Sequence, residues 1–191
     1  MLQEFTEEIE ETAAAVVNGI HTAMPGEIVS FDAGSGTASV QPVGKFVTSD
    51  GNELDYPLIT EVPVVFPFCQ QIHAGMAFPV KKGDSCIVII SEVELDAWRG
   101  GAESEGTLRF DLTNAVAIPG LLKGGSALVQ KAADQNAVFI GTSGAEVGIF
   151  GDCVRIRTAG AQLEVSESGI TAGGSLKVNG SIFYTGVCQK V

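Results

Sequence analysis

The sequence predicts a mainly β protein that begins with one helix. Three observations lead to this fold class: an apolar stripe at helical spacing near the start, short alternating strands in the middle, and apolar pairs punctuated by glycine near the end. These patterns divide the 191 residues into an N-terminal helix (1–23), a barrel domain (24–121), a linker (122–135) and a C-terminal β region (136–191).

The helix is predicted over residues 2–22, where glutamates occupy the face opposite the apolar stripe. The stripe consists of Leu2, Phe5, Ile9, Ala13, Val16, Val17 and Ile20. Pro25-Gly26 is expected to end the helix. Because one helix of this length is marginal alone, we expect the stripe to contact either sister copies of the chain or a neighbouring hub protein.

The middle of the chain, residues 26–120, reads as short strands separated by turns. The predicted strands are 27–31, 37–41, 62–67, 86–90 and 115–118. The prolines of the third strand place it at a sheet edge. Glu92–Trp98 is expected to form one helical turn, with Trp98 as a core anchor rather than a sugar-binding platform. Strands of this number and length, with one central insertion, predict a small closed barrel of the OB type.

The C-terminal region, residues 136–188, contains apolar pairs at spacing two, separated by glycines. The pairs are Val138/Ile140, Val147/Ile149, Val154/Ile156, Leu163/Val165, Leu176/Val178 and Ile182/Tyr184. A single copy would leave open strand edges. We therefore expect three chains to intertwine around one axis, with the apolar residues inward. Arg155, Arg157, Glu164 and Lys177 would then face water. The alternative, a single-chain β-solenoid, would have too few coils to bury its own core.

Charge excludes one class of partner. Residues 1–135 hold 7 Lys/Arg and 19 Asp/Glu, which gives 7 − 19 = −12, whereas residues 136–191 hold 4 of each and are neutral. An acidic body repels phosphate backbones, so nucleic acid is not an expected partner. The neutral C-terminal third is free to approach an anionic lipopolysaccharide surface.

The cellular compartment follows from the start of the chain and from the cysteines. The first residues are acidic, unlike the positively charged opening of a secretion signal, and no apolar run approaches the roughly 20 residues that span a bilayer. We therefore expect synthesis and folding in a cytoplasm. Cys69, Cys86, Cys153 and Cys188 form no Cys-X-X-Cys pair, which favours reduced, mostly buried thiols over a structural zinc site.

No residue is assigned a catalytic, cofactor-binding or metal-binding role, and an enzyme is not expected. Glu92, Glu94 and Asp96 alternate and could bind calcium in an extended strand, but a solvated face is favoured. Glu164 and Glu167 could form a glycosidase-like acid pair. Because no cleft-forming sequence surrounds them, surface positions are favoured.

An ordered series of sequence blocks carries a family resemblance. The blocks are Met24–Val29, Val40–Pro42, Val62–Pro67, Phe78–Asp84, Ser91–Glu92, Asp96–Trp98 and Arg109–Gly120. This series resembles the N-terminal OB-fold domain of phage baseplate spike proteins of the Mu-like, membrane-piercing group. The glycine-punctuated C-terminal region is similar to the trimeric β-helix of that family.

The resemblance implies a homotrimer in the tail baseplate of a virion, assembled in the host cytoplasm. The OB domains would form a collar against hub or tail-tube proteins, and the β-helix would point at the cell. Sheath contraction would then drive the spike through the bacterial outer membrane. Two alternatives stay open: a trimeric receptor-binding or polysaccharide-cleaving tail protein, and an OB module that binds carbohydrate or nucleic acid.

One departure from the family concerns the tip. Several members carry a C-terminal His-X-His that binds iron as a trimer, whereas the histidines here are His21 and His73. We therefore predict no iron site. A separate small tip protein, or apolar residues such as Phe183 and Val187, would close the end. Three Cys188 thiols could bind a soft metal, but inert packing is favoured.

Overall fold

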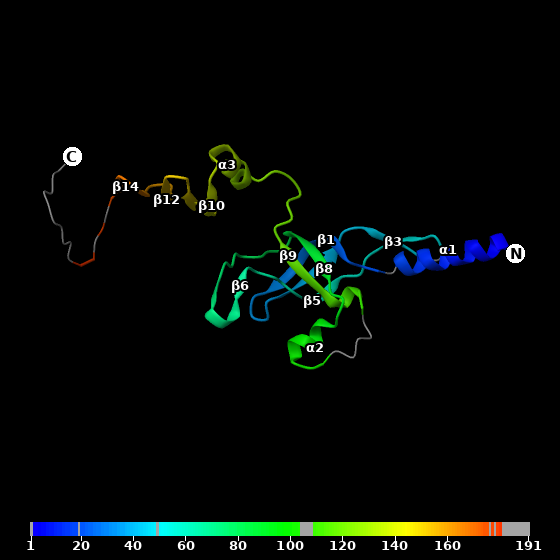
Figure 1. Ribbon diagram of the computed structural model, residues 1–191. Helices are drawn as coiled ribbons and strands as arrows, with labels where there is room; N and C mark the ends of the chain where they lie inside the picture. The colour runs from blue at the N-terminus through cyan, green and yellow to red at the C-terminus, as the bar shows by residue number, and fades with distance from the viewer. Residues whose placement is uncertain are drawn as a thin grey trace. The chain divides into compact units, whose positions relative to one another are not determined.

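The computed structural model describes residues 2–18, 20–48, 50–103, 109–175, 177 and 179–180 (Figure 1). The chain divides into two compact units, one ending at Lys123 and the other beginning at Gly124. Strands predominate in both, which confirms the predicted mainly β class.

The predicted N-terminal helix is present as α1 (Leu2–Asn18). It ends well before Pro25-Gly26, because both residues already belong to strand β1 (Ala23–Asp32). The Ile90 backbone N–H donates to the Thr22 carbonyl at 2.8 Å, so the strand ladder captures the chain just after the helix. Pro25 fits within β1 because its carbonyl accepts from the Val43 N–H at 2.8 Å, while the N–H that it lacks is not required.

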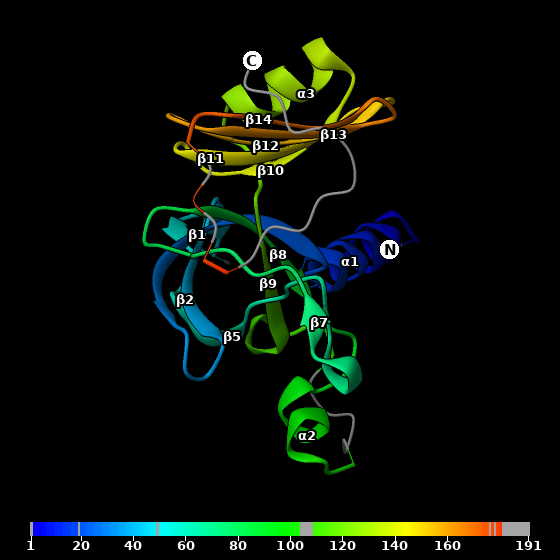
Figure 2. The ribbon, with the colours of Figure 1, turned by 90° about the vertical axis from the view of Figure 1, so that its left-hand side faces the viewer.

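The first unit is built on a five-stranded antiparallel sheet with the order β5-β2-β1-β8-β9 (Figure 2). Besides β1, the strands are β2 (Thr37–Pro42), β5 (Ile59–Pro63), β8 (Ser85–Ile90) and β9 (Ala115–Pro119). Beyond the end of β5, Val64 forms a parallel bridge with Ala117 of β9, and the Val65 N–H donates to the Ala117 carbonyl at 2.9 Å. The sheet therefore rolls into a half-barrel. Its proline-bearing strand, β5, lies at the edge as predicted, but it ends at Pro63 and so lies earlier in the chain than the predicted range 62–67.

The hydrophobic core fills the inside of this half-barrel. Its largest fully buried side chains are Ile28, Val40, Val62, Cys86 and Val88. They lie at alternate positions of their strands, which is why alternation in the sequence located β1 and β2, whereas β8 was expected from its continuous apolar run. Gly26 belongs to the same packing, since a Cβ at this position would lie 2.7 Å from Val40 Cγ1.

Short elements connect the main strands of the first unit. They are the hairpin β3 (Lys45–Val47) and β4 (Glu53–Asp55), β6 (Phe68–Cys69), η1 (Gln70–Ile72), β7 (Ala74–Gly75), α2 (Leu95–Gly100) and η2 (Leu112–Asn114). The expected helical turn is α2, but Trp98 is 74% exposed. The interpretation of Trp98 as a core anchor is therefore wrong, because α2 is a short insertion with no buried residue.

The second unit consists of one helix and one antiparallel meander. The elements are α3 (Ala127–Gln135), β10 (Val138–Gly141), β11 (Ala145–Ile149), β12 (Cys153–Thr158), β13 (Gln162–Ser166) and β14 (Gly169–Gly173). Helix α3 occupies the segment expected to be a linker, and β14 is a strand that the spacing pattern did not predict. In the described part of this unit the strands of one chain pair with each other as a single sheet, and no β-helix is seen. Leu176, Val178, Ile182 and Tyr184 lie outside the described residues.

Candidate assembly surfaces

One face of the β10–β14 sheet consists of apolar side chains, except for Thr158 at the end of β12. Strand register places Val154 opposite both Ile149 and Val165, and Ile156 opposite Val147 and Leu163. We call this surface the apolar face, and it comprises Val138, Ile140, Val147, Ile149, Val154, Ile156, Leu163, Val165, Ile170 and Ala172.

The apolar face is exposed in the single chain. Val138 is 59% exposed, Ile156 48% and Ile170 72%. On the opposite face, by contrast, Phe139, Glu146 and most of their neighbours on β10–β13 are buried or half-buried. The usual relation between polarity and burial is thus inverted across this sheet.

Helix α3 explains the inversion, because it lies on one face of the sheet only (Figure 2). Lys131 of α3 donates to the carboxylate of Glu146, and its Nζ lies 4.7 Å from the ring centroid of Phe139. Phe139 meets Phe150 edge-on at 5.7 Å. Gly148 lies beneath these two rings, where a Cβ would come within 2.9 Å of both. We call this covered surface the α3 face.

The charged residues of β12 and β13 lie on the α3 face, and they pair with polar neighbours there. Arg155 Nε donates to Glu164 Oε2 at 2.5 Å, and the guanidinium lies 4.6 Å from the ring centroid of Phe150. The hydrogen bond to Glu164 raises the pKa of Arg155. Arg157 donates to Gln162, with Nη2 and Oε1 separated by 3.0 Å. Arg155 and Glu164 are therefore half-buried and paired, where the sequence led us to expect solvated groups.

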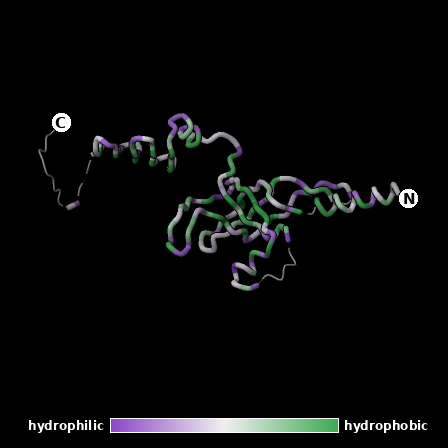
Figure 3. The backbone as a smooth tube through the Cα atoms, in the orientation of Figure 1, coloured by the Kyte–Doolittle hydropathy of each residue, from purple (hydrophilic) through white to green (hydrophobic). Residues whose placement is uncertain are grey.

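The apolar stripe of α1 is the second exposed surface. Phe5 is 61% exposed, Ile9 52% and Val16 62%, and no described element packs extensively against them. Hydrophobic and hydrophilic positions alternate along this helix (Figure 3). A shallow hollow of about 620 Å³ follows the stripe from Phe5 to Val17, with Glu8 at its border.

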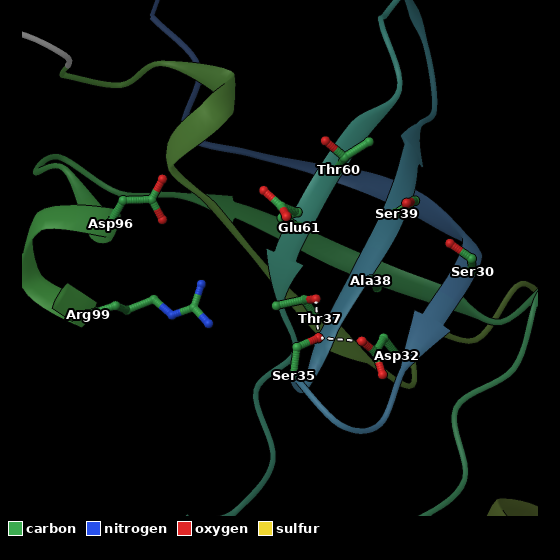
Figure 4. Close-up of a pocket in the computed structure, with 10 residues that line it drawn as sticks. All are labelled: Ser30, Asp32, Ser35, Thr37, Ala38, Ser39, Thr60, Glu61, Asp96 and Arg99. Atoms are coloured by element: carbon green, nitrogen blue, oxygen red, sulfur yellow. Dashed lines mark hydrogen bonds between the residues drawn. The ribbon is translucent and has the colours of Figure 1, made fainter.

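A polar hollow of about 470 Å³ lies on the half-barrel (Figure 4). It is lined by Ser30, Asp32, Ser35, Thr37, Ala38, Ser39, Thr60, Glu61, Asp96 and Arg99. Asp32 accepts hydrogen bonds from Gly34 N and Ser35 Oγ, and the first of these contributes most to lowering its pKa. Asp32 therefore shapes the β1–β2 turn.

The acidic groups that the sequence singled out are not brought together as sites. Glu92 pairs with Arg109 at 2.7 Å, and the described residues contain no group of three metal-ligating side chains. Glu164 pairs with Arg155, while Glu167 lies in the turn between β13 and β14.

The cysteines and histidines also have individual settings. Cys86 and Cys153 are buried and Cys69 is exposed, which fits the expectation of mostly buried thiols among the described cysteines. Burial raises the pKa of Cys86 to about 11. His21 packs edge-on against Tyr56 at 5.7 Å, and His73 ends η1 in a left-handed conformation. Phe183, Val187 and Cys188, considered above for the tip, lie outside the described residues.

Uncovered apolar surfaces of this extent are typical of sites where proteins bind one another. The model of the family described as "phage protein Gp138 N-terminal domain" matches residues 24–120, and the chain belongs to this family. The protein is thus a structural component of a phage tail or baseplate and is associated with the virion. A comparison with curated proteins gave no match. Among the described helices, none is long and apolar enough to cross a membrane.

Proposed function

We propose that this chain is the central spike of a contractile tail baseplate, a homotrimer that punctures the bacterial outer envelope when the sheath contracts. The observation that carries the proposal is the inverted burial of the β10–β14 sheet. A sheet that covers its charged face with α3 and exposes its aliphatic face is incomplete as a single chain.

Sister copies of the chain are the proposed cover for the apolar face. Burying an aliphatic side chain completely contributes about 1.5–3 kcal/mol, so half-exposed side chains contribute roughly half of that each. Summed over the apolar face, this contribution is comparable with the cost of association, about 4–15 kcal/mol. Three copies that turn these faces to a common axis form a rod with a dry interior and with α3 on the outside.

The form of the trimer differs from the intertwined rod that the sequence led us to expect. Each inner strand of the β10–β14 sheet already has two hydrogen-bonded neighbours from its own chain. Only the outer edges of β10 and β14 remain for pairing with another copy. The proposed trimer therefore forms mainly by contact between sheet faces.

The distribution of charge supports self-association through the second unit. Residues 124–191 hold five Lys/Arg and five Asp/Glu, which gives 5 − 5 = 0, whereas residues 1–123 hold six and eighteen, which gives 6 − 18 = −12. Three neutral units can approach one another without net repulsion. The acidic first unit keeps the assembly soluble.

The half-barrel supports the proposed place of this chain in the baseplate. Its strand order and the parallel bridge between its edge strands support the predicted five-stranded, partly open OB barrel. We propose that three OB domains form a collar that contacts the hub or tail-tube proteins. The spike then faces the outer membrane, with or without a separate tip protein. This role requires no catalytic group, cofactor or nucleic acid.

The test is the molar mass of the purified full chain in light scattering, followed by imaging of intact particles. We expect a mass of three chains and a position on the tail axis. A mass of one chain would contradict the proposal. A mass of two would also contradict it, because it would indicate a face-to-face sandwich.

A receptor-binding or polysaccharide-cleaving tail protein is the second candidate. The polar hollow favours it, because hydroxyls and the acids Glu61 and Asp96 surround a space large enough for a sugar ring. Incubation with host-cell polysaccharide would release reducing ends if this candidate holds, and the spike proposal predicts none.

A further inference from the structure

We propose that α1 binds a groove with an apolar floor and Lys/Arg rims on a second tail protein. The inference rests on the proposed function, which places the chain at the end of a tail. It goes further by stating the chemistry of the partner.

No described element covers the apolar stripe of α1. Phe5, Ile9 and Val16 are each more than half exposed, and their spacing of four and seven residues places them on one side of the helix. A helix of this length is marginal without a partner. The stripe therefore requires a cover to keep α1 folded.

The negative charge of α1 indicates a basic partner. All five ionisable residues within Leu2–Asn18 are glutamates, and the helix carries no Lys or Arg. At 100° per residue, Glu8 and Glu10 fall on the two opposite sides of the stripe. A partner that covers the stripe meets a carboxylate on both sides, so its rims must be basic for the surfaces to be complementary.

The alternative occupants fit less well. In a bundle of three α1 helices, a heptad register that places Phe5, Ile9 and Val16 at the interface also places Thr12 there. Such a bundle would span little more than two heptads and would bring acidic helices together with no basic residue to offset them. An anionic membrane attracts helices with Lys and Arg on the polar face, and α1 has neither.

The test adds purified full chain to tail particles assembled without it and measures incorporation at low and high salt. We expect the unmodified chain to join the particles less readily as salt rises, because exposed ion pairs are screened. The charge reversal E8K/E10K should lower incorporation about tenfold or more at low salt. I9S/V16S should lower it at every salt concentration. The matched control D50K/D55K makes the same change of charge at exposed residues outside α1 and should incorporate like the unmodified chain.

Each contrary outcome has a distinct meaning. Equal incorporation of E8K/E10K and the unmodified chain would overturn the inference and leave the proposed function intact. Loss of the trimer mass of the free I9S/V16S chain would show that sister helices cover the stripe, and would overturn the inference as well. Binding of the chain to vesicles containing phosphatidylglycerol, if it depends on α1, would also overturn the inference. If particles reject the unmodified chain, the proposed function itself fails.

Discussion

The ion pair between Lys131 and Glu146 links α3 to β11, and the Lys131 Nζ also lies over the ring of Phe139. This contact links α3 to the face of the C-terminal sheet that is covered within the chain. Both side chains are mostly shielded from water, with 28% and 19% exposure, so the pair is screened less than a surface salt bridge.

The first prediction concerns this contact. Lys131→Met removes the cation and leaves Glu146 without its partner, so we expect α3 to open more easily, by about 1 kcal/mol. Hydrogen exchange of the α3 amides should become about fivefold faster. Gln130→Met, on the exposed side of the same helix, is the control. Equal exchange in the two variants would show that the ion pair does not hold the helix.

The second prediction tests the apolar face. Ile156→Asp places a carboxylate in the proposed trimer interior, near the common axis. Burying an unpaired charge there costs several kcal/mol per copy. We expect single chains in analytical ultracentrifugation. Thr171→Asp makes the same addition on the exposed part of the α3 face and should remain trimeric. Unchanged hydrogen exchange of α3 in Ile156→Asp would show that the monomer is folded, and a trimeric Ile156→Asp would contradict the face assignment.

The third prediction concerns pH. Asp111 accepts hydrogen bonds from the hydroxyl and the backbone N–H of Thr113, and these lower its pKa in the folded state. A lowered pKa stabilises the fold above the ordinary carboxyl pKa, and this stabilisation is lost as the pH falls through the lowered value. Asp111→Asn replaces the carboxylate with a neutral acceptor, so it should reduce the free energy of unfolding by about 1 kcal/mol at pH 7.

The difference between Asp111→Asn and the unmodified chain should shrink in acid, when Asp111 itself is protonated. Urea denaturation at pH 7 and near pH 3 measures it. Asp50→Asn, at an exposed turn, should show no difference at either pH. An equal difference in the free energy of unfolding at the two pH values would contradict the role assigned to the Asp111 carboxylate.

The fourth prediction separates the cysteines. Burial holds the pKa of Cys86 near 11, so at pH 8 only about one thiol in a thousand is ionised, and the side chain is also shielded. Cys69 is exposed. Alkylation followed by peptide mass mapping should label Cys69 at least about tenfold faster than Cys86. Comparable rates would indicate that the half-barrel opens readily in solution.

The fifth prediction tests the packing of the half-barrel. A methyl group at Gly26 would lie 2.7 Å from Val40 Cγ1 and 2.8 Å from Val88 Cγ2, so Gly26→Ala should destabilise the first unit by about 1–3 kcal/mol. Gly124→Ala is the matched control, because nothing lies within 4 Å of its added methyl group. Equal thermal denaturation midpoints for the two variants would contradict this account.

Alternation was enough to predict two strands of the half-barrel, those that carry Ile28 and Val40, because one face of each strand is buried. Strand β8 was predicted instead from its unbroken apolar run, Cys86–Ile90, which shows no alternation. The position of β5 at the edge followed from its prolines. The end of α1 was not predictable in this way, because strand pairing by Thr22 and Pro25 is a long-range contact that overrides a local proline signal.

The sequence predicted which residues share a face of the C-terminal sheet, but not which face the chain covers by itself. That choice depends on α3, a helix of nine residues whose apolar and polar positions segregate as they do in α1, although its segment was expected to be a linker. Asn136, which ends α3 in a left-handed conformation, and Ser126 at its start were the signals that could have located it. The exposure of Trp98 was also beyond local reasoning, since an aromatic residue on a short insertion is buried only where another element covers it.

The order in which the two units fold follows from their strand connections. Every strand of the β10–β14 meander pairs with its immediate neighbours in the sequence, so its contacts are local and its formation is fast. The half-barrel is expected to form more slowly, because β1 pairs with β8, which lies about sixty residues later in the chain. In the proposed trimer, sister chains would therefore associate after their sheets have formed. Association of the subunits, rather than strand formation, would then limit the rate of assembly.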